Sequence, residues 1–152
     1  ELARKLRNLA PRALDCSSVE LYRFDRGGQL LRRLLSPEAG DAIPVEASKS
    51  SAPGDHAVAL CFRNRAALAI GDTRRSPLYW GLNREAIPRS VVLVPTFARE
   101  EMTGVMQVSV YGRTRIYAVE ELIALQHMAN QVAMVQKLQE NQARKEQMMR
   151  SE

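Results

Sequence analysis

The clearest strand patterns along the chain lie in its second half. Residues 91–94 are four consecutive apolar side chains, which is typical of a central strand covered on both faces. In residues 103–112, apolar positions alternate with the polar Gln107 and Ser109, so this second strand has one polar face. Only four residues separate it from the strand predicted over residues 90–98, which favours a β-hairpin. The polar pair is predicted either to face solvent or to line a pocket.

Four shorter strands are predicted before this hairpin. Residues 18–25 combine apolar and aromatic side chains, and an Arg-Gly-Gly turn joins them to residues 29–35 in a first hairpin. The apolar stretches over residues 43–47 and 66–70 each suit one short strand. Apart from the strand over 43–47, residues 36–55 are rich in Pro, Ala, Ser and Gly and are interpreted as a long irregular connection.

Two helices are predicted in the first half of the chain. Residues 1–10 place three leucines at helical spacing with basic residues on the other side, and Pro11 limits the length of this helix. A second, short helix is expected over residues 56–64. Its expected N-cap is Asp55, and its expected inward-facing residues are Ala57, Leu60 and Cys61.

A long helix is predicted at the end of the chain. From residue 117 onward there is no Pro or Gly, and apolar residues repeat at intervals of three and four. At about 1.5 Å per residue, such a helix extends beyond a compact domain, so part of it is expected to pack against a partner. Its first apolar residues are expected to cover the sheet, and the later ones to pack against their symmetry mates in a homodimer or against the N-terminal leucines. The predicted interface residues are Leu2, Leu6, Leu9, Met128, Val132, Val135 and Leu138.

Composition and charge fit one soluble domain. The 152 residues suit a single core, and 22 basic residues scattered among 17 acidic ones form no concentrated patch, which argues against nucleic-acid binding. No apolar stretch approaches the roughly 20 residues of a membrane span, so no membrane association is expected. Cys16 and Cys61 belong to no metal-binding or redox motif, and both are expected to be reduced in the cytoplasm. No cofactor can be named from the sequence.

The order of these elements resembles a GAF domain, and five segments carry the resemblance. Residues 17–22 read Ser-Ser-Val-Glu-Leu-Tyr, and residues 64–72 contain Asn-Arg and then Leu-Ala-Ile-Gly-Asp, like the family's first strand and its helix, turn and strand end. Residues 90–95, Ser-Val-Val-Leu-Val-Pro, and residues 103–108, Thr-Gly-Val-Met-Gln-Val, are similar to two central strands of the family. Residues 120–133 resemble its closing helix.

This resemblance implies an α+β fold. A central antiparallel sheet of about six strands is expected, with the terminal helices on one face and pocket-forming connections on the other. The chain then divides into an N-terminal helix over residues 1–12, a GAF-like core over 13–127 and a C-terminal signalling and dimerisation helix over 128–152, in one domain overall.

Three known GAF subclasses are disfavoured residue by residue. The cyclic-nucleotide signature N-K-x-F-x-D-E is absent, and Cys61 lacks the adjacent His that is common in bilin-linking domains. Two cysteines beside apolar or small residues match free methionine sulfoxide reductases poorly. His56 and His127, without an acidic cluster, form no metal site, and His127 is interpreted as structural because it lies in an apolar helix.

Most of the candidate ligand-binding residues lie in residues 73–89. Aromatic side chains there offer flat apolar contact, and arginines can pair with carboxylate or phosphate. The alternative is that the aromatic residues cap the core, that the arginines are solvated and that the polar pair of the second strand is simply exposed. The candidates are His56, Arg74, Arg75, Tyr79, Trp80, Arg84, Arg89, Gln107 and Ser109.

The resemblance implies a non-catalytic sensory or regulatory domain. It would bind an unidentified small molecule, dimerise through its terminal helices, or do both, and thereby control an output domain attached after the long helix. A histidine kinase, a cyclic di-GMP enzyme or a transcriptional regulator would be typical parent proteins. Two alternatives remain open: a purely structural dimerisation module without a ligand, and a thiol-redox enzyme of the GAF fold.

Overall fold

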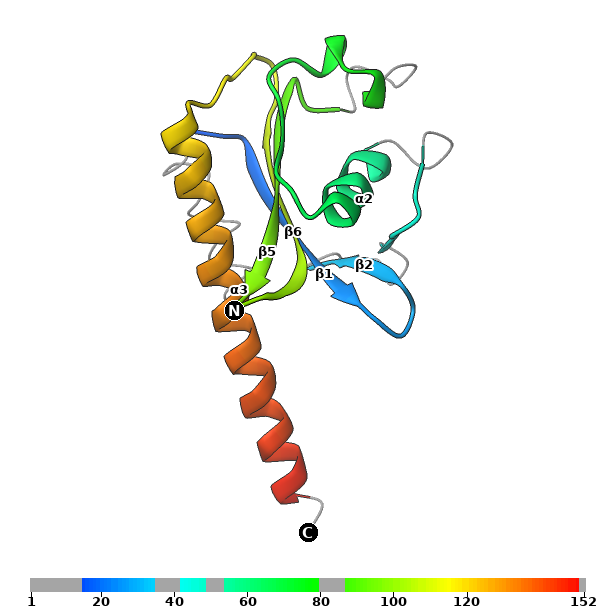
Figure 1. The fold of residues 1–152 in the computed structure, drawn as a ribbon, viewed down its shortest axis with the longest axis vertical. Coiled ribbons are helices and arrows are strands. Elements are labelled where there is room, and N and C mark those ends of the chain that lie inside the picture. Colours follow the sequence, from blue (N-terminus) through cyan, green and yellow to red (C-terminus); the bar gives the residue numbers. More distant parts are fainter. Residues whose placement is uncertain (1–14, 35–41, 49–53, 80–86, 151–152) are drawn as a thin grey trace.

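The fold is given by a computed structural model that describes residues 15–34, 42–48, 54–79 and 87–150. Within these ranges six strands form one antiparallel sheet with helices on both faces, which confirms the predicted α+β class (Figure 1). Along the sheet the strands lie in the order β3-β2-β1-β6-β5-β4, so β6 lies between β1 and β5. The strands are β1 (Ser18–Asp25), β2 (Leu30–Arg33), β3 (Ala42–Pro44), β4 (Leu68–Ile70), β5 (Ser90–Ala98) and β6 (Glu101–Val110).

The predicted hairpin is formed by β5 and β6, and β6 pairs with β1 at the centre of the sheet. All four residues of 91–94 are buried, as expected for a strand covered on both faces. The hairpin turn is tighter than predicted, because Ala98 still pairs with Glu101 and only two residues remain between the strands. One of them, Arg99, has a positive φ of 60°, the conformation that two-residue hairpin turns require.

One face of the sheet is covered by α3 (Val119–Arg150), the long helix predicted at the end of the chain. Leu125, Ala129 and Val132 on its inner side pack against residues of β1, β5 and β6 in one apolar cluster. In Figure 1 the helix runs from yellow to red, and its second half extends past the end of the sheet. Residues 141–150 are all exposed.

The contact between α3 and the sheet continues well beyond residue 127, which is the last residue of the predicted GAF-like core. Arg23 on β1 donates from Nε and Nη2 to the two carboxylate oxygens of Glu140, over 2.9 and 2.7 Å. Lys137 reaches Glu101 Oε2 over 2.6 Å. These ion pairs show that the sheet positions the helix as far as Glu140.

The opposite face is covered by α2 (Asp55–Asn64) and by two single 3₁₀ turns, η1 (Thr73–Arg75) and η2 (Pro77–Tyr79). The prediction that Asp55 caps α2 was wrong, because the helix begins at Asp55 and the capping position is Gly54 with a φ of 84°. That left-handed backbone suits glycine. Leu60, predicted to face inward, is only half-buried. The buried residues of α2 are Ala57, Val58, Ala59 and Cys61.

Candidate functional site

Four polar side chains lie together on the α2-facing side of the sheet, where their neighbours are apolar. Across the β1–β6 pair, Ser18 lies opposite Ser109 and Glu20 lies opposite Gln107. Directly opposite residues of antiparallel strands share a face, and so do residues two apart on one strand. These four residues, called the polar block below, therefore form two adjacent rows. At the same level, β5 contributes apolar residues of the cluster beneath α2.

The polar block is largely closed to solvent. Ser109 is 1% exposed and Glu20 is 8% exposed. Gln107 Nε2 donates a hydrogen bond to Ser109 Oγ over 3.1 Å, and Arg33 Nε on β2 lies 3.4 Å from Glu20 Oε2. Burying a carboxylate, an amide and hydroxyl groups is less favourable than burying apolar side chains of similar size. Such an arrangement inside an apolar layer is typical of a binding site.

Sequence reasoning predicted half of this block. Gln107 and Ser109 were candidates, and the structure places both of them on the α2-facing side of the sheet. Ser18, Glu20 and Arg33 were missed. The alternation of Ser-Val-Glu-Leu at the start of β1 could have indicated a polar face, but only the register of β1 against β6 shows that the two polar faces adjoin.

The connection between β4 and β5 carries one of the predicted aromatic candidates, Tyr79, on the same side of the sheet. Tyr79, at the end of η2, is 4% exposed and belongs to the apolar cluster beneath α2, and this burial raises the pKa of its phenol. Thr73 closes the two ends of the connection, donating from its backbone to Arg89 O over 2.9 Å and from Oγ1 to Pro88 O over 2.6 Å. Trp80 and Arg84 lie outside the described residues.

The described arginines of this connection do not converge on the polar block. Arg74 pairs with Asp72, with Nη2 and Oδ2 2.7 Å apart, and Asp72 also accepts from the backbone N–H of Arg74 at the start of η1. This hydrogen bonding lowers the pKa of Asp72 to about 2. Arg75 is exposed and lines an open depression of about 590 Å³ with residues of β4 and the β6–α3 connection. Arg89 is half-buried and contributes its backbone carbonyl to Thr73.

The described cysteines are poorly placed for thiol chemistry. Cys61 is 1% exposed, and burial raises its pKa to about 12, so the thiol stays protonated at neutral pH. Cys61 belongs to the cluster beneath α2, whereas Cys16 packs against the cluster beneath α3. The sheet therefore separates the two sulfur atoms, and they cannot form a disulfide in this fold.

The histidines also remain apart. His56 lies partly buried in the first turn of α2, and His127 is exposed on α3. Among the residues that the structure describes, no three His, Cys, Asp or Glu side chains gather as a metal site would require.

The predicted interface residues on α3 fall into two groups. Val132 is 6% exposed and Met128 is half-buried, and both pack against the sheet, so they serve the core of this chain. Val135 and Leu138, by contrast, are 39% and 62% exposed. Leu2, Leu6 and Leu9 lie outside the described residues. No helix in the described ranges is long and apolar enough to span a membrane.

Comparison with solved structures shows the same architecture in several bacterial domains. The GAF domain of a phosphoenolpyruvate-protein phosphotransferase from Coxiella burnetii is 13% identical, with a TM-score of 0.72 over 94% of this chain and 87% of that one. The second GAF domain of DevS from Mycobacterium smegmatis is 18% identical, with a TM-score of 0.66 over 94% and 96%. Free methionine-R-sulfoxide reductase from Neisseria meningitidis, solved with its substrate, is 18% identical, with a TM-score of 0.67 over 94% and 81%.

The sequence gives a direct family assignment. No curated protein matches the chain. The family model described as "GAF domain" matches residues 1–135, which is most of the chain. GAF domains are typically sensory or regulatory, although the similar reductase shows that the fold also occurs in enzymes. With the six-stranded sheet and its closing helix, this match shows that the chain belongs to the GAF domain family.

Proposed function

We propose that this chain is a non-catalytic sensory or regulatory GAF domain that binds a small molecule over the polar block. The observation that carries the proposal is the block itself, in which the buried Glu20 and Ser109 and the half-buried Ser18 and Gln107 adjoin inside an apolar face of the sheet. Small-molecule sites combine a mostly apolar lining with a few convergent polar groups in this way. The expected output is control of a domain attached after α3.

The chemistry of the block and of the side chains beside it limits the kind of ligand. Glu20 accepts hydrogen bonds, Arg33 donates them, and the amide of Gln107 does both. Tyr79 and the valine and leucine side chains of β5 supply apolar contact on the same face. The fitting ligand is therefore a compact, partly apolar molecule that carries both donors and acceptors.

A ligand screen with matched variants tests this proposal. Native mass spectrometry of the unheated protein and a thermal-shift panel of metabolites would identify a ligand, and Gln107→Leu should abolish its stabilising shift. Thr96→Val is the control, because it removes a buried hydroxyl that bonds to Thr103, outside the polar block. An equal shift in Gln107→Leu, or no ligand for the wild type, would count against binding at the block and favour a purely structural module.

The competing enzyme hypothesis draws on the similarity to the methionine sulfoxide reductase. The burial of Cys61 and its separation from Cys16 across the sheet weigh against thiol catalysis. Turnover should therefore be undetectable with free methionine-R-sulfoxide and a thiol reductant. Activity that disappears in Cys61→Ser would overturn the non-catalytic assignment.

Signal output is proposed to pass through a homodimer formed by the outer side of α3. Because successive helical residues turn by about 100°, Ile123 and Leu138 lie roughly opposite the sheet-facing Leu125, Ala129 and Val132, and Val135 lies about a quarter turn away from them. The three outer residues are 54%, 39% and 62% exposed. An apolar stripe on each side of one helix is typical of a helix that packs on its own domain and on a partner.

Substitutions on the outer stripe test the dimer. Leu138→Glu should shift the protein toward monomer in sedimentation velocity, since it would place a carboxylate in the interface. Tyr111→Glu is the control, because it replaces a 48% exposed apolar side chain that lies outside α3. A wild-type chain that remains monomeric at high concentration would refute the dimer and leave the ligand proposal untouched.

A further inference from the structure

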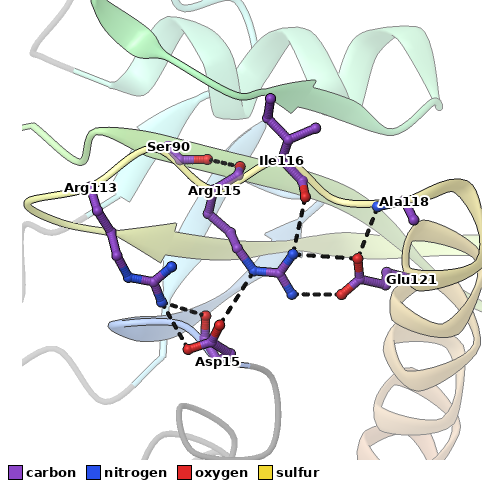
Figure 2. A network of polar contacts seen from close by, with 7 residues as sticks. All are labelled: Asp15, Ser90, Arg113, Arg115, Ile116, Ala118 and Glu121. Atoms are coloured by element: carbon purple, nitrogen blue, oxygen red, sulfur yellow. Dashed lines mark hydrogen bonds and ion pairs between the residues drawn. The ribbon is translucent and has the colours of Figure 1, made fainter.

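The connection between β6 and α3 holds a side chain that touches two distant segments (Figure 2). The guanidinium of Arg115 donates to both carboxylate oxygens of Glu121, in the first turn of α3, over 2.6 and 3.3 Å. On its other side, its Nε lies 3.7 Å from Asp15 Oδ2, just before β1. The Arg115 side chain is only 19% exposed, so water screens these interactions less than it would on an open surface.

The backbone of Arg115 is held from the opposite direction by Ser90, the first residue of β5. Ser90 Oγ lies 2.6 Å from Arg115 O and 3.2 Å from Ile70 O, and Ser90 is 1% exposed. Ser90 directly follows Arg89, whose carbonyl accepts from Thr73 at the other end of the β4–β5 connection. The Ser90 hydroxyl, at the end of that connection, therefore lies within hydrogen-bonding distance of two carbonyls, that of Ile70 at the end of β4 and that of the residue that contacts α3, and its single hydrogen can be donated to either.

Glu121 links the same arginine to the start of α3. Its Oε1 accepts from the backbone N–H of Ala118 over 2.9 Å and so caps the helix. The hydrogen bond from Arg115 lowers the pKa of Glu121, which keeps the cap negatively charged. A displacement of the Arg115 guanidinium would therefore displace the Glu121 carboxylate, which caps the start of the helix.

Asp15 is the more weakly bound of the two carboxylates that contact Arg115. Arg113 Nη2 donates to Asp15 Oδ1 over 2.8 Å, but the Asp15 side chain is 71% exposed. Exposed ion pairs contribute little and are screened by salt. The side chain of Asp15 therefore contributes less to holding Arg115 than the side chain of Glu121 does.

We propose that Arg115 is a positioning residue that couples the β4–β5 connection to the start of α3 through Ser90 and Glu121. This regulatory role rests on the proposed function, because ligand contact near Tyr79 is the event that would move the connection. A displacement of the connection would shift Ser90, then Arg115, and finally the cap of the helix.

Amide hydrogen exchange on the unliganded full chain tests the coupling directly. Glu121→Gln keeps an oxygen for the Ala118 cap but removes the ion pair with Arg115. It should speed exchange at residues 73–79 about fivefold relative to the β5–β6 core, which reports global unfolding. The control is Lys137→Gln, which removes an ion pair of the same helix that does not involve Ser90, Arg115 or Glu121. It should leave the exchange rates of residues 73–79 unchanged. Faster exchange confined to the first turns of α3 in Glu121→Gln would overturn the proposal.

The route through Ser90 is tested by a double variant. Ser90→Ala should speed exchange both at residues 73–79 and at residues 119–125. Adding Glu121→Gln to it should produce no further increase at residues 73–79, because the link is already broken. Independent, additive effects of the two substitutions would exclude this route. Since no ligand is used, failure here is distinct from failure of ligand binding.

Discussion

The carboxylate of Asp72, beside the edge strand β4, is bound by both the backbone and the side chain of one residue, Arg74. It follows β4 by two positions, accepts from the backbone N–H of Arg74 over 3.1 Å and pairs with the side chain of the same arginine. These contacts involve residues two apart in the sequence, so they are local to the start of η1. They explain why Arg74, a candidate for anion binding, has a partner within its own connection.

The depressed pKa of Asp72 predicts an acid-sensitive contribution to stability. The folded pKa of about 2 lies below the unfolded value of about 3.9, so the contribution is complete above pH 4 and is lost as the pH falls toward 2. Asp72→Asn should therefore be less stable than the wild type at pH 5, with a difference that shrinks at lower pH. Urea unfolding at several pH values measures this, and a constant difference would contradict it.

At the scale of elements, Gly104 marks a place where β6 leaves no room for a side chain beside β1. Gly104 pairs with Arg23, and a Cβ at Gly104 would overlap the backbone carbonyl of Tyr22. A carbonyl fixed within a strand cannot move aside as a flexible side chain can. The glycine therefore sets how closely the two strands approach.

Gly104→Ala is accordingly expected to destabilise the fold by about 1–3 kcal/mol, because the strands must separate locally. Gly27→Ala is the matched control: its Cβ would meet only the side chain of Asp25 at an ordinary distance of 3.5 Å. Chemical unfolding of both variants makes the comparison. Equal stabilities of the two variants would show that β1 and β6 tolerate a wider spacing.

The elements that sequence patterns predicted well are those with a strong periodicity. The predicted bounds of β1 and β5 match the structure, and α3 begins within two residues of its predicted start. The start of α2 was placed one residue late, because its cap is a glycine backbone conformation and involves no side-chain hydrogen bond. The polar block was half predicted, since Ser18 and Glu20 join it through the pairing of β1 with β6, which no local pattern contains.

At the scale of the whole molecule, α3 has a part that belongs to the domain and a part that leaves it. Glu140 is its last residue with a described ion pair to the sheet, and residues 141–150 are all exposed. The stability of the domain should therefore depend on the helix up to Glu140 and very little on the residues beyond it.

Two truncations test this division. A chain that ends at Asn141 should lose less than about 1 kcal/mol of unfolding free energy, because all of the described residues that it removes, 142–150, are exposed. A chain that ends at Gln136 should lose more, since it also lacks the ion pairs that Lys137 and Glu140 make with the sheet. Thermal unfolding monitored by circular dichroism separates the cases, and equal melting temperatures would move the boundary of the domain toward Gln136.

The continuity of α3 past the sheet also fixes a direction in space for whatever follows it. Its 32 residues span about 48 Å, and each inserted residue would rotate everything downstream by about 100°. An insertion of seven residues after Glu140 would nearly restore the original angle, whereas an insertion of two would leave the attached part facing almost the other way. The number of helical residues after Glu140 therefore determines the orientation of an attached domain as well as its distance from the sheet.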